Sequence, residues 1–483
     1  MNKDRLLTAL KTWFTKIDWL LLCFLLLVLD IKLAVKIAAI VLVYLVRPDF
    51  RFSFRLRSLR DSKLPVFYFC MPVIAVLDWL FRHQFDLNQD VLLLCGLFFW
   101  GFCILIAHQL RLFADKGDPE KVHRTITLFF FLNFLVSVGT LVGIMITTGA
   151  INPYTWTGEG QTYFISTGDH IQGIMFDFSL TNALINAMGV IYFIFRRQFG
   201  MVIACMCVQL LAGSNLTNLL IGAILVFLFF YKSSRAQKIT TAVCLLLMVF
   251  FMKVVSPENK NYAVVTLATI AGHNTIDVTS QEDTNYHISK KEVLLMKKAE
   301  VMEEKFIYKP TKEQAKYPGK MISYQQTIQF LLANPWFVPL GTGAGHFSSK
   351  LAFRASSLGT EGGYPARFTY IDPNFQHNHL AVFLYYFTKG NKHHSIIHTP
   401  FSVLNQMLGE YGLAGLAALA LLYFGFFIRR SEMNVYRWLM LGLMAIALCT
   451  DYWFEQLSIV IIFELLWFVD IRQPGPSHSE TQV

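Results

Sequence analysis

The sequence has little charge for its length. Only 15% of its 483 residues are Asp, Glu, Lys or Arg, whereas 54% are hydrophobic and 44 are Phe. The mean hydropathy is +0.46. This balance excludes an ordinary soluble domain and indicates a polytopic membrane protein.

Cysteine is absent from the one long polar segment, 256–409. All eight cysteines fall in hydrophobic runs, so no disulfide framework is expected. Cys205 and Cys207 are two residues apart, which places them on different faces of a helix and argues against a metal site. The first hydrophobic block has no small-residue cleavage site, and we expect it to remain as an anchor.

A nucleic-acid motif is also absent, although the net charge is +10. Basic loops beside membrane spans attract anionic lipid headgroups at the inner surface. Membrane lipids therefore account for the positive charge, and no nucleic-acid partner is expected.

Hydrophobic runs divide the chain into twelve candidate spans, each near the length that a bilayer requires. We predict an all-α polytopic integral membrane protein with spans near 17–29, 31–46, 64–81, 91–108, 125–147, 178–195, 199–213, 216–231, 239–255, 410–428, 436–450 and 453–470. Asp30, Lys32 and Lys36 interrupt the first two. These two form either a hairpin or one span followed by an interfacial helix, and the second alternative reverses the side of every later loop.

The distribution of Lys and Arg predicts the topology. With the hairpin, the basic segments all lie on one side, namely the N-terminus, 47–63, 111–124, 196–197, 232–238 and 429–437, whereas the opposite turn at 148–177 has no Lys or Arg. Short basic loops stay in the cytoplasm, so both termini are predicted to be cytoplasmic. Residues 1–255 then carry spans one to nine, 256–409 form a large periplasmic loop domain, 410–470 carry the last three spans, and 471–483 form a cytoplasmic tail.

The segment 256–409 contains eight of the thirteen histidines, so we look for polar chemistry there. It is predicted to contain an amphipathic helix at 289–306 and a second helix at 319–334 that ends at Pro335. The glycine-rich stretch 339–347 allows backbone conformations that other residues resist. It lacks the preceding strand and the spacing of a nucleotide-binding loop.

Four short motifs in this region resemble the O-antigen ligase and O-antigen polymerase superfamily. They are Gly319-Lys320-Met-Ile-Ser-Tyr324, Asn334-Pro335-Trp-Phe, Gly341-Thr-Gly-Ala-Gly-His-Phe347 and Gln406-Met-Leu-Gly-Glu410-Tyr-Gly412-Leu-Ala-Gly415, and a short stretch around 212–215 adds to them. That superfamily is polytopic and GT-C-like, with a large periplasmic loop near its C-terminal third. The topology predicted above has the same form.

The resemblance implies a metal-independent glycosyltransferase that depends on a lipid carrier and has no cofactor. The donor would be an undecaprenyl-pyrophosphate-linked glycan, and the acceptor a glycan, lipid A core or a protein hydroxyl. The reaction would take place at the periplasmic face of the bacterial inner (plasma) membrane, in biosynthesis of lipopolysaccharide or another cell-surface polysaccharide. It would need a base for the acceptor hydroxyl and fixed cations for the departing pyrophosphate.

The chain departs from the usual pattern of the superfamily at three positions. Asn215 stands where an Arg is usual, and Lys320 replaces a second Arg, which keeps the charge but loses the planar fork. The usual His would lie in the register of 400–402, and the nearest candidate is His398, which Pro400 separates from the following helix. Either the chain is a divergent member whose cations come from elsewhere in the loop, or the fold is kept and the chemistry is lost.

The candidate site residues follow from these requirements. We predict His398 and Glu410 as catalytic, and Lys320, Arg354, Arg367, His346 and Asn215 as substrate-binding. Each has a structural alternative: a hydrogen-bonded histidine, a solvated cation, or, for Glu410, a carboxylate stabilised by the dipole at the start of a helix. Two pairs of histidines occur in the segment, His377 with His379 and His393 with His394. Neither pair has a nearby cysteine or the i, i+4 spacing of a helical metal site, so no metal is expected.

Two other classes of function remain open. A polysaccharide transporter or lipid-linked glycan flippase would need polar groups along the bundle and broken helices at the midplane. Asp78 and Glu464 are the charges to test for such a path. The spans are mostly Leu, Phe, Ile and Val, which favours an enzyme acting at the outer interface. A non-catalytic envelope membrane protein is the third possibility, since the first Arg is missing.

Overall fold

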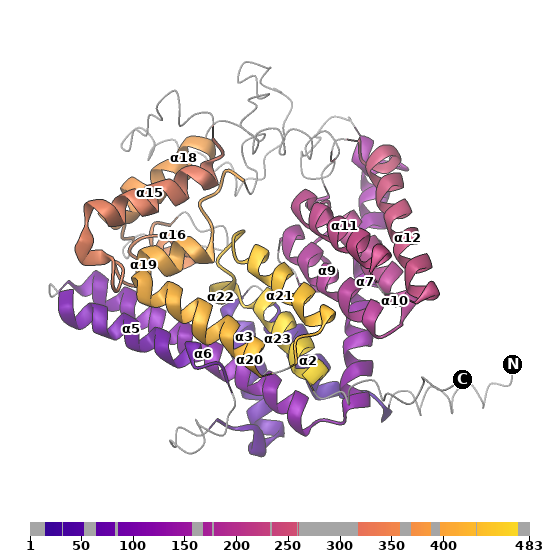
Figure 1. The fold of residues 1–483 in the computed structure, drawn as a ribbon, viewed down its shortest axis with the longest axis horizontal. Coiled ribbons are helices and arrows are strands. Elements are labelled where there is room, and N and C mark those ends of the chain that lie inside the picture. Colours follow the sequence, from indigo (N-terminus) through magenta and orange to yellow (C-terminus); the bar gives the residue numbers. More distant parts are fainter. Residues whose placement is uncertain are drawn as a thin grey trace, which may run out of the picture.

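The computed structural model describes residues 15–30, 32–52, 64–82, 86–156, 168–175, 178–231, 234–257, 259, 317–357, 369–387, 397–430 and 432–471. Within these residues every regular element is a helix (Figure 1). The predicted all-α class is confirmed for this part of the chain. The helix expected at 289–306, the histidine pair at 393 and 394, and Arg367 lie outside the described residues.

The helices before residue 260 are α2 (Trp19–Val28), α3 (Leu33–Val46), α5 (Phe67–Arg82), α6 (Leu87–Lys116), α7 (Pro119–Thr148), α9 (Ser179–Phe195), α10 (Phe199–Leu211), α11 (Asn215–Phe230) and α12 (Arg235–Phe250). A π-helical turn, Phe251–Val255, extends α12. Short 3-10 turns occur at Pro48–Phe50, Pro153–Thr155 and Gly173–Met175.

The later helices are α15 (Gly319–Ala333), α16 (Lys350–Ala355), α17 (Pro373–Phe375), α18 (Ala381–Phe387), α19 (Val403–Ala417), α20 (Gly425–Arg429), α21 (Val435–Ala447), α22 (Trp453–Gln456) and α23 (Ser458–Ile471). π-helical segments precede α18, at Gln376–Leu380, and join α19 to α20, at Ala418–Phe424. The helix predicted at 319–334 is therefore confirmed to within one residue.

Among the residues that the structure describes, four helices are long and apolar enough to cross a membrane: α6, α7, α12 with its π-helical turn, and the continuous run Val403–Arg429. Seven further apolar helices in the same residues have 10–17 residues each. These helices support an integral membrane protein. Each of the twelve expected spans overlaps a described helix, but that all twelve cross the bilayer stays a prediction. α6 and α7 extend beyond the predicted bounds because polar residues such as Arg111 and Asp115, an i, i+4 ion pair at 2.8 Å, continue the helix past its apolar part.

The first two helices form a hairpin. The Asp18 amide, at the start of α2, donates to Thr125 Oγ1 at the start of α7. Beyond the end of α3, the Phe50 carbonyl accepts a hydrogen bond from Gln109 near the end of α6. Because α6 and α7 are joined by a two-residue turn, the start of α2 and the end of α3 lie at the same end of the bundle. The hairpin was one of the two alternatives for this segment, and it is the one that the topology prediction uses.

The turn between α6 and α7 is specified locally. Asp118 Oδ1 accepts a hydrogen bond from the Glu120 amide at 3.0 Å and caps α7. Pro119 occupies the first helical position, where its missing N–H costs nothing. A Cβ at Gly117 would lie 2.4 Å from the Phe113 carbonyl oxygen, so only glycine fits there. These contacts allow the chain to reverse between two 30-residue helices in two residues.

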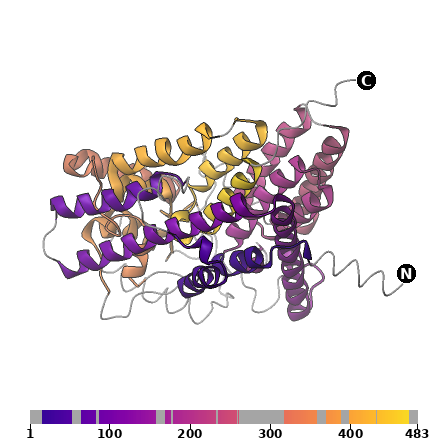
Figure 2. The ribbon, with the colours of Figure 1, turned by 90° about the horizontal axis from the view of Figure 1, so that it is seen from below.

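The helices are arranged in three groups. Figures 1 and 2 show α5, α6 and α19–α20 running together on one side, and α7 with α9–α12 on the other. Helices α21 and α23 lie between them, and α23 packs against both α6 and α9. α23 is buried along almost its whole length, which explains why its sequence is apolar on every face. The shorter helices α15, α16 and α18 cover the outer end of the first group (Figure 1).

The contacts between loops fall into the two sets that the charge pattern predicted. In the basic set, Lys116 Nζ lies 3.5 Å from Asp49 Oδ2. In the opposite set, Asn152 Nδ2 donates to the Val255 carbonyl at 2.8 Å, which joins the Lys- and Arg-free turn to the end of α12. These two contacts agree with the predicted grouping. The full topology, the cytoplasmic side of the basic loops and the bacterial inner membrane stay predictions.

Candidate functional site

The glycine-rich loop after α15 has the backbone conformation that its sequence suggested. Gly341, Gly343 and Gly345 all have positive φ, at 82°, 95° and 79°. Side chains with a Cβ rarely adopt this region of backbone space, so the three glycines are required by the path of the chain. The three glycines alternate with Thr342 and Ala344, and they change the direction of the chain before α16 begins.

This loop is interlocked with the turn inside α19. The Thr342 amide donates to the Gly409 carbonyl at 2.9 Å, and the Gly343 amide donates to the Glu410 carbonyl at 3.0 Å. In the other direction, the Leu413 amide donates to the Val338 carbonyl at 2.8 Å. Two motifs about 70 residues apart in the sequence therefore form one backbone unit.

The interlock depends on the absence of side chains. A Cβ at Gly341 would lie 2.2 Å from the Glu410 carbonyl carbon, and one at Gly412 would lie 2.6 Å from the Gly341 nitrogen. Gly412 also breaks α19, with φ 63° and ψ −159°. The break is filled by the loop, since its carbonyls accept the amides that follow Gly412. We call this unit, residues 338–347 with 409–414, the interlocked core.

Glu410 lies at the centre of the interlocked core and is 1% exposed. Its Oε1 accepts hydrogen bonds from the Ser348 amide at 3.1 Å and the Phe347 amide at 3.4 Å. No hydrogen-bond partner of Oε2 is present among the described residues. The expectation that Glu410 begins a helix is wrong: it lies within α19, just before the Gly412 break, and loop amides rather than a helix dipole stabilise its carboxylate.

His346, within the interlocked core, forms a dyad with Asp372, which lies outside it. His346 Nδ1 lies 2.8 Å from Asp372 Oδ2, and the same oxygen accepts a hydrogen bond from the Tyr370 hydroxyl at 3.4 Å. The other carboxylate oxygen, Oδ1, caps α17 by accepting from the Asn374 amide at 2.7 Å. Asp372 is therefore held from three directions. A carboxylate bonded to one ring nitrogen fixes the tautomer of a histidine and leaves the second nitrogen able to accept a proton.

The dyad also faces Asp78, near the end of α5. A Cβ at Gly343 would lie 2.9 Å from Asp78 Oδ2 and 3.2 Å from His346 Cδ2, so the carboxylate and the imidazole flank the same glycine. Asp78 is 4% exposed. The residue that was singled out as a charge on an ion path thus belongs to the junction between α5 and the outer loop.

Lys320 is tied into the same region through its backbone and its side chain. Its amide donates to the Ile397 carbonyl at 2.9 Å, and Nζ donates to the carbonyls of Phe401 and, at 3.2 Å, Thr450. Burial lowers the pKa of Lys320 to about 8, and nearby Asp451 opposes part of that shift. An ammonium has three donors, so one remains for another acceptor.

His398 is placed by structural contacts. Its Nδ1 accepts a hydrogen bond from the Gly319 amide at 3.3 Å, and its ring stacks on Tyr386 with centroids 4.5 Å apart. It precedes α19, which begins at Val403, so Pro400 does interrupt the helix as expected. These contacts place His398 behind the first turn of α15, next to the backbone of Lys320.

Arg354, at the end of α16, points toward α6. Its guanidinium lies 6.0 Å from the centre of the Phe99 ring and interacts electrostatically with Glu455. Glu455 Oε2 also accepts a hydrogen bond from the Lys350 amide at 2.5 Å. The segment between Phe347 and Lys350 is thus held by two carboxylates, Glu410 at one end and Glu455 at the other.

An aromatic cluster borders both candidate cations. The Phe353 ring lies 4.9 Å from that of Phe401, and both contact Tyr452. Phe401 provides the carbonyl that binds Lys320, and Phe353 immediately precedes Arg354. Both cations therefore lie beside residues of this cluster.

Asn215 lies elsewhere. It begins α11, and its Nδ2 donates to Asn259 Oδ1 at 3.1 Å, while no partner of its own Oδ1 is found among the described residues. Asn259 in turn donates to Ser256 Oγ at 2.8 Å. The described contacts of Asn215 join α11 to the segment after α12, and none of them joins it to the interlocked core.

The histidine at 379 is structural. Its Nε2 lies 3.1 Å from Thr327 Oγ1, its ring packs 4.8 Å from that of Phe347, and burial lowers its pKa to about 3. In the described part of the chain, no group of three or more His, Cys, Asp or Glu side chains is placed to hold a metal ion.

Glu464, the second charge considered for an ion path, is enclosed by tyrosines. Its Oε1 accepts hydrogen bonds from the Tyr68 hydroxyl at 2.5 Å and the Tyr423 hydroxyl at 3.2 Å. The carboxylate therefore joins α5, the π-helical segment after α19, and α23. This is the contact expected of a structural link between helices.

Sequence reasoning missed Asp372, Glu455 and Tyr452. Asp372 stands before Pro373 in an Asp-Pro pair, which signals a capped turn but no partner. Tyr452, whose hydroxyl lies 2.7 Å from Ser348 Oγ, and Glu455 were assigned to the edge of a span. Nothing in their local sequence indicates that the chain returns to the loop there.

Comparison with known proteins adds no further constraint. The chain matches no protein-family model, no curated protein and no solved structure.

Proposed function

We propose that this protein is a metal-independent, membrane-bound glycosyltransferase that transfers or polymerises an undecaprenyl-pyrophosphate-linked glycan. The interlocked core carries the proposal. It joins two of the motifs that resemble O-antigen ligases and polymerases, and it contains a buried carboxylate, Glu410, and the histidine of the His346–Asp372 dyad. The apolar helices below that junction suit a polyprenyl donor.

The cations account for binding of the pyrophosphate. Lys320 keeps one donor after its two backbone carbonyls, and Arg354 contributes a guanidinium whose planar fork matches phosphate oxygens. Both are fixed by contacts before any donor binds, which is the condition for stabilising charge that develops on a leaving group. In this chain they take the place of the arginines that are usual in the superfamily.

The His346–Asp372 dyad fits the base better than His398 does. In the proposed step, the acceptor hydroxyl oxygen forms a bond to the anomeric carbon of the donor sugar, and the bond from that carbon to the pyrophosphate oxygen breaks. The hydroxyl proton moves to His346 Nε2, and the pyrophosphate leaves with the bonding electrons. Asp372 holds the tautomer that can accept this proton. Glu410 positions the loop that carries His346.

The location of the polar groups favours transfer over transport. A transporter would use a broken helix to line a path at the midplane. The break in α19 at Gly412 is instead filled by the backbone of the outer loop. Glu464, a buried charge among the helices, accepts hydrogen bonds at Oε1 from two tyrosine hydroxyls.

A deletion strain tests the proposal through its surface glycans, separated on a gel and stained for lipopolysaccharide and capsule. Loss of the ladder with accumulation of carrier-linked long glycan indicates a ligase, and core with a single repeat indicates a polymerase. Wild-type protein must restore the profile, and the Lys320→Met and Arg354→Gln variants must restore it poorly while reaching the membrane at equal levels. Absence of carrier-linked glycan on the outer side indicates a flippase, and an unchanged profile indicates a protein-directed transferase or a non-catalytic envelope protein.

A further inference from the structure

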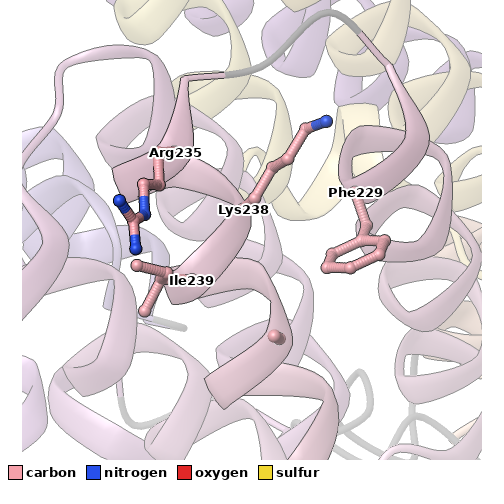
Figure 3. Close-up of a pocket in the computed structure, with 5 residues that line it drawn as sticks. Phe229, Arg235, Lys238 and Ile239 are labelled. Atoms are coloured by element: carbon pink, nitrogen blue, oxygen red, sulfur yellow. The ribbon is translucent and has the colours of Figure 1, made fainter.

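A separate cavity lies between the end of α11 and the first turns of α12. It has a volume of about 350 Å³ and is lined by Phe229, Arg235, Lys238, Ile239 and Ala242. In Figure 3 the Lys238 side chain extends from α12 toward the helix that carries Phe229, and the Arg235 side chain lies next to Ile239. The lining therefore combines two cations with an apolar wall and contains no carboxylate.

The two cations differ from several others in the same set of loops. Lys116 pairs with Asp49, Arg124 with Glu120, and Arg437 with Asp470. Among the residues that the structure describes, no carboxylate lies within ion-pair distance of Arg235 or Lys238, so their charge is left for a ligand. The backbone amides of Ser234 and Gln237 at the start of α12 already have hydrogen-bond partners, since the two residues form a reciprocal capping box.

An exposed apolar face begins where the cations end. Ile239, Val243, Leu246 and Phe250 follow one another at helical spacing, and Leu246 and Phe250 are 69% and 56% exposed. Arg235 heads this same face, one turn before Ile239. The face runs along α12, one of the four helices long enough to cross a membrane. A ligand with an anionic end and a long apolar end would be complementary to it over its whole length.

We propose that this cavity is a binding site for an anionic phospholipid at the membrane surface opposite the glycan-transfer site. Arg235 and Lys238 bind the headgroup phosphate. Phe229, Ile239 and Ala242 contact the glycerol and the first acyl carbons, and the acyl chain follows the exposed face of α12. The site lies between the end of α11 and the start of α12, and it does not depend on the proposed transfer reaction.

Lipid retention by the full-length purified protein tests this site. Delipidated protein is titrated with dioleoylphosphatidylglycerol or dioleoylphosphatidylcholine, and bound lipid is counted by native mass spectrometry. The wild type is expected to retain the anionic lipid in preference to the zwitterionic one. The double variant Arg235→Gln/Lys238→Gln is expected to bind the anionic lipid roughly tenfold more weakly. Equal retention of both lipids by the wild type would overturn the proposal.

Three controls separate this site from a general basic surface. The double variant Arg429→Gln/Arg430→Gln removes the same charge from another basic turn that does not line the cavity. It should change the affinity less than about twofold, which is below the contribution of one cation in contact with a headgroup. The Ala242→Trp variant keeps both cations but fills the cavity, and it should also lose the lipid. Inorganic phosphate in excess should not displace the lipid. Equal losses in the two double variants, full retention by Ala242→Trp, or displacement by phosphate would each contradict the assigned site.

Discussion

The Asp372→Asn substitution separates catalysis from folding in the proposed site. Asparagine is nearly isosteric with aspartate and caps helices equally well, so its oxygen can still accept from the Asn374 amide. Its Nδ2 then faces His346 Nδ1, across the 2.8 Å contact that now joins the imidazole to a carboxylate oxygen. An NH₂ group donates to Nδ1, which forces the proton of the neutral imidazole onto Nε2. That nitrogen can no longer accept the proton of the acceptor hydroxyl.

The expected loss of transfer rate follows from what a general base contributes. Loss of such a base lowers the rate by about 10²–10⁴-fold. The free energy of unfolding should change by less than about 1 kcal/mol, since the cap and one hydrogen bond to His346 persist. Transfer is measured as undecaprenyl pyrophosphate released by protein in nanodiscs, and stability as the Tm of the same sample.

The matched control is Tyr370→Phe. It removes only the 3.4 Å hydrogen bond to Asp372 and leaves the His346 contact intact, so its rate should stay within about threefold of the wild type, in line with one weak neutral hydrogen bond. If Asp372→Asn retains more than half of the wild-type rate with an unchanged Tm, His346 is not the base.

Four further outcomes follow from the structure. Because the pKa of Lys320 is lowered to about 8, its ammonium is lost as pH rises through about 8, so the rate should fall there, and Lys320→Arg should move that fall to higher pH. The same shift means that between about pH 8 and the ordinary lysine pKa of about 10.5 the unfolded chain binds more protons than the folded one, so this group should make the free energy of unfolding rise with pH in that window. The Gly409→Ala variant should lower the free energy of unfolding by about 1–3 kcal/mol, because its Cβ would lie 2.1 Å from a carbon of the Phe347 ring. The control Gly442→Ala should not lower the free energy of unfolding, because no atom lies within 4 Å of its Cβ. Denaturant titration compares the two variants. Treatment with EDTA should leave the transfer rate unchanged, and a loss restored by a divalent cation would contradict a metal-independent reaction.

The helices could be predicted from sequence wherever a long apolar run or a clear cap was present. The all-α class, the helix at 319–333 and the positive φ of the glycine-rich loop were readable for this reason. Polar ends of helices were underestimated, as at α6, because ion pairs such as Arg111 with Asp115 sustain a helix where hydropathy falls. Local sequence thus defines elements better than it defines their ends.

The candidate site was predictable in its motifs but not in its pairings. The sequence pointed to His346 and Glu410, yet it gave no sign that Asp372 binds one or that the amides of Phe347 and Ser348 bind the other. His398 was preferred because it lies near the expected position in the chain, and its stacking on Tyr386 could not be foreseen. Such contacts join residues tens of positions apart, and only the packing of α15, α16 and α19 decides them.

In the proposed function, the junction around the interlocked core transfers glycan from a lipid carrier. The most direct measurement supplies purified protein in nanodiscs with carrier-linked glycan extracted from a strain that lacks the protein, in the presence of EDTA. Mass spectrometry then counts the undecaprenyl pyrophosphate that is released. The account predicts steady release by the wild type and about a hundredfold less by His346→Gln at equal Tm. Absence of release by folded wild-type protein, or equal release by the variant, would contradict it.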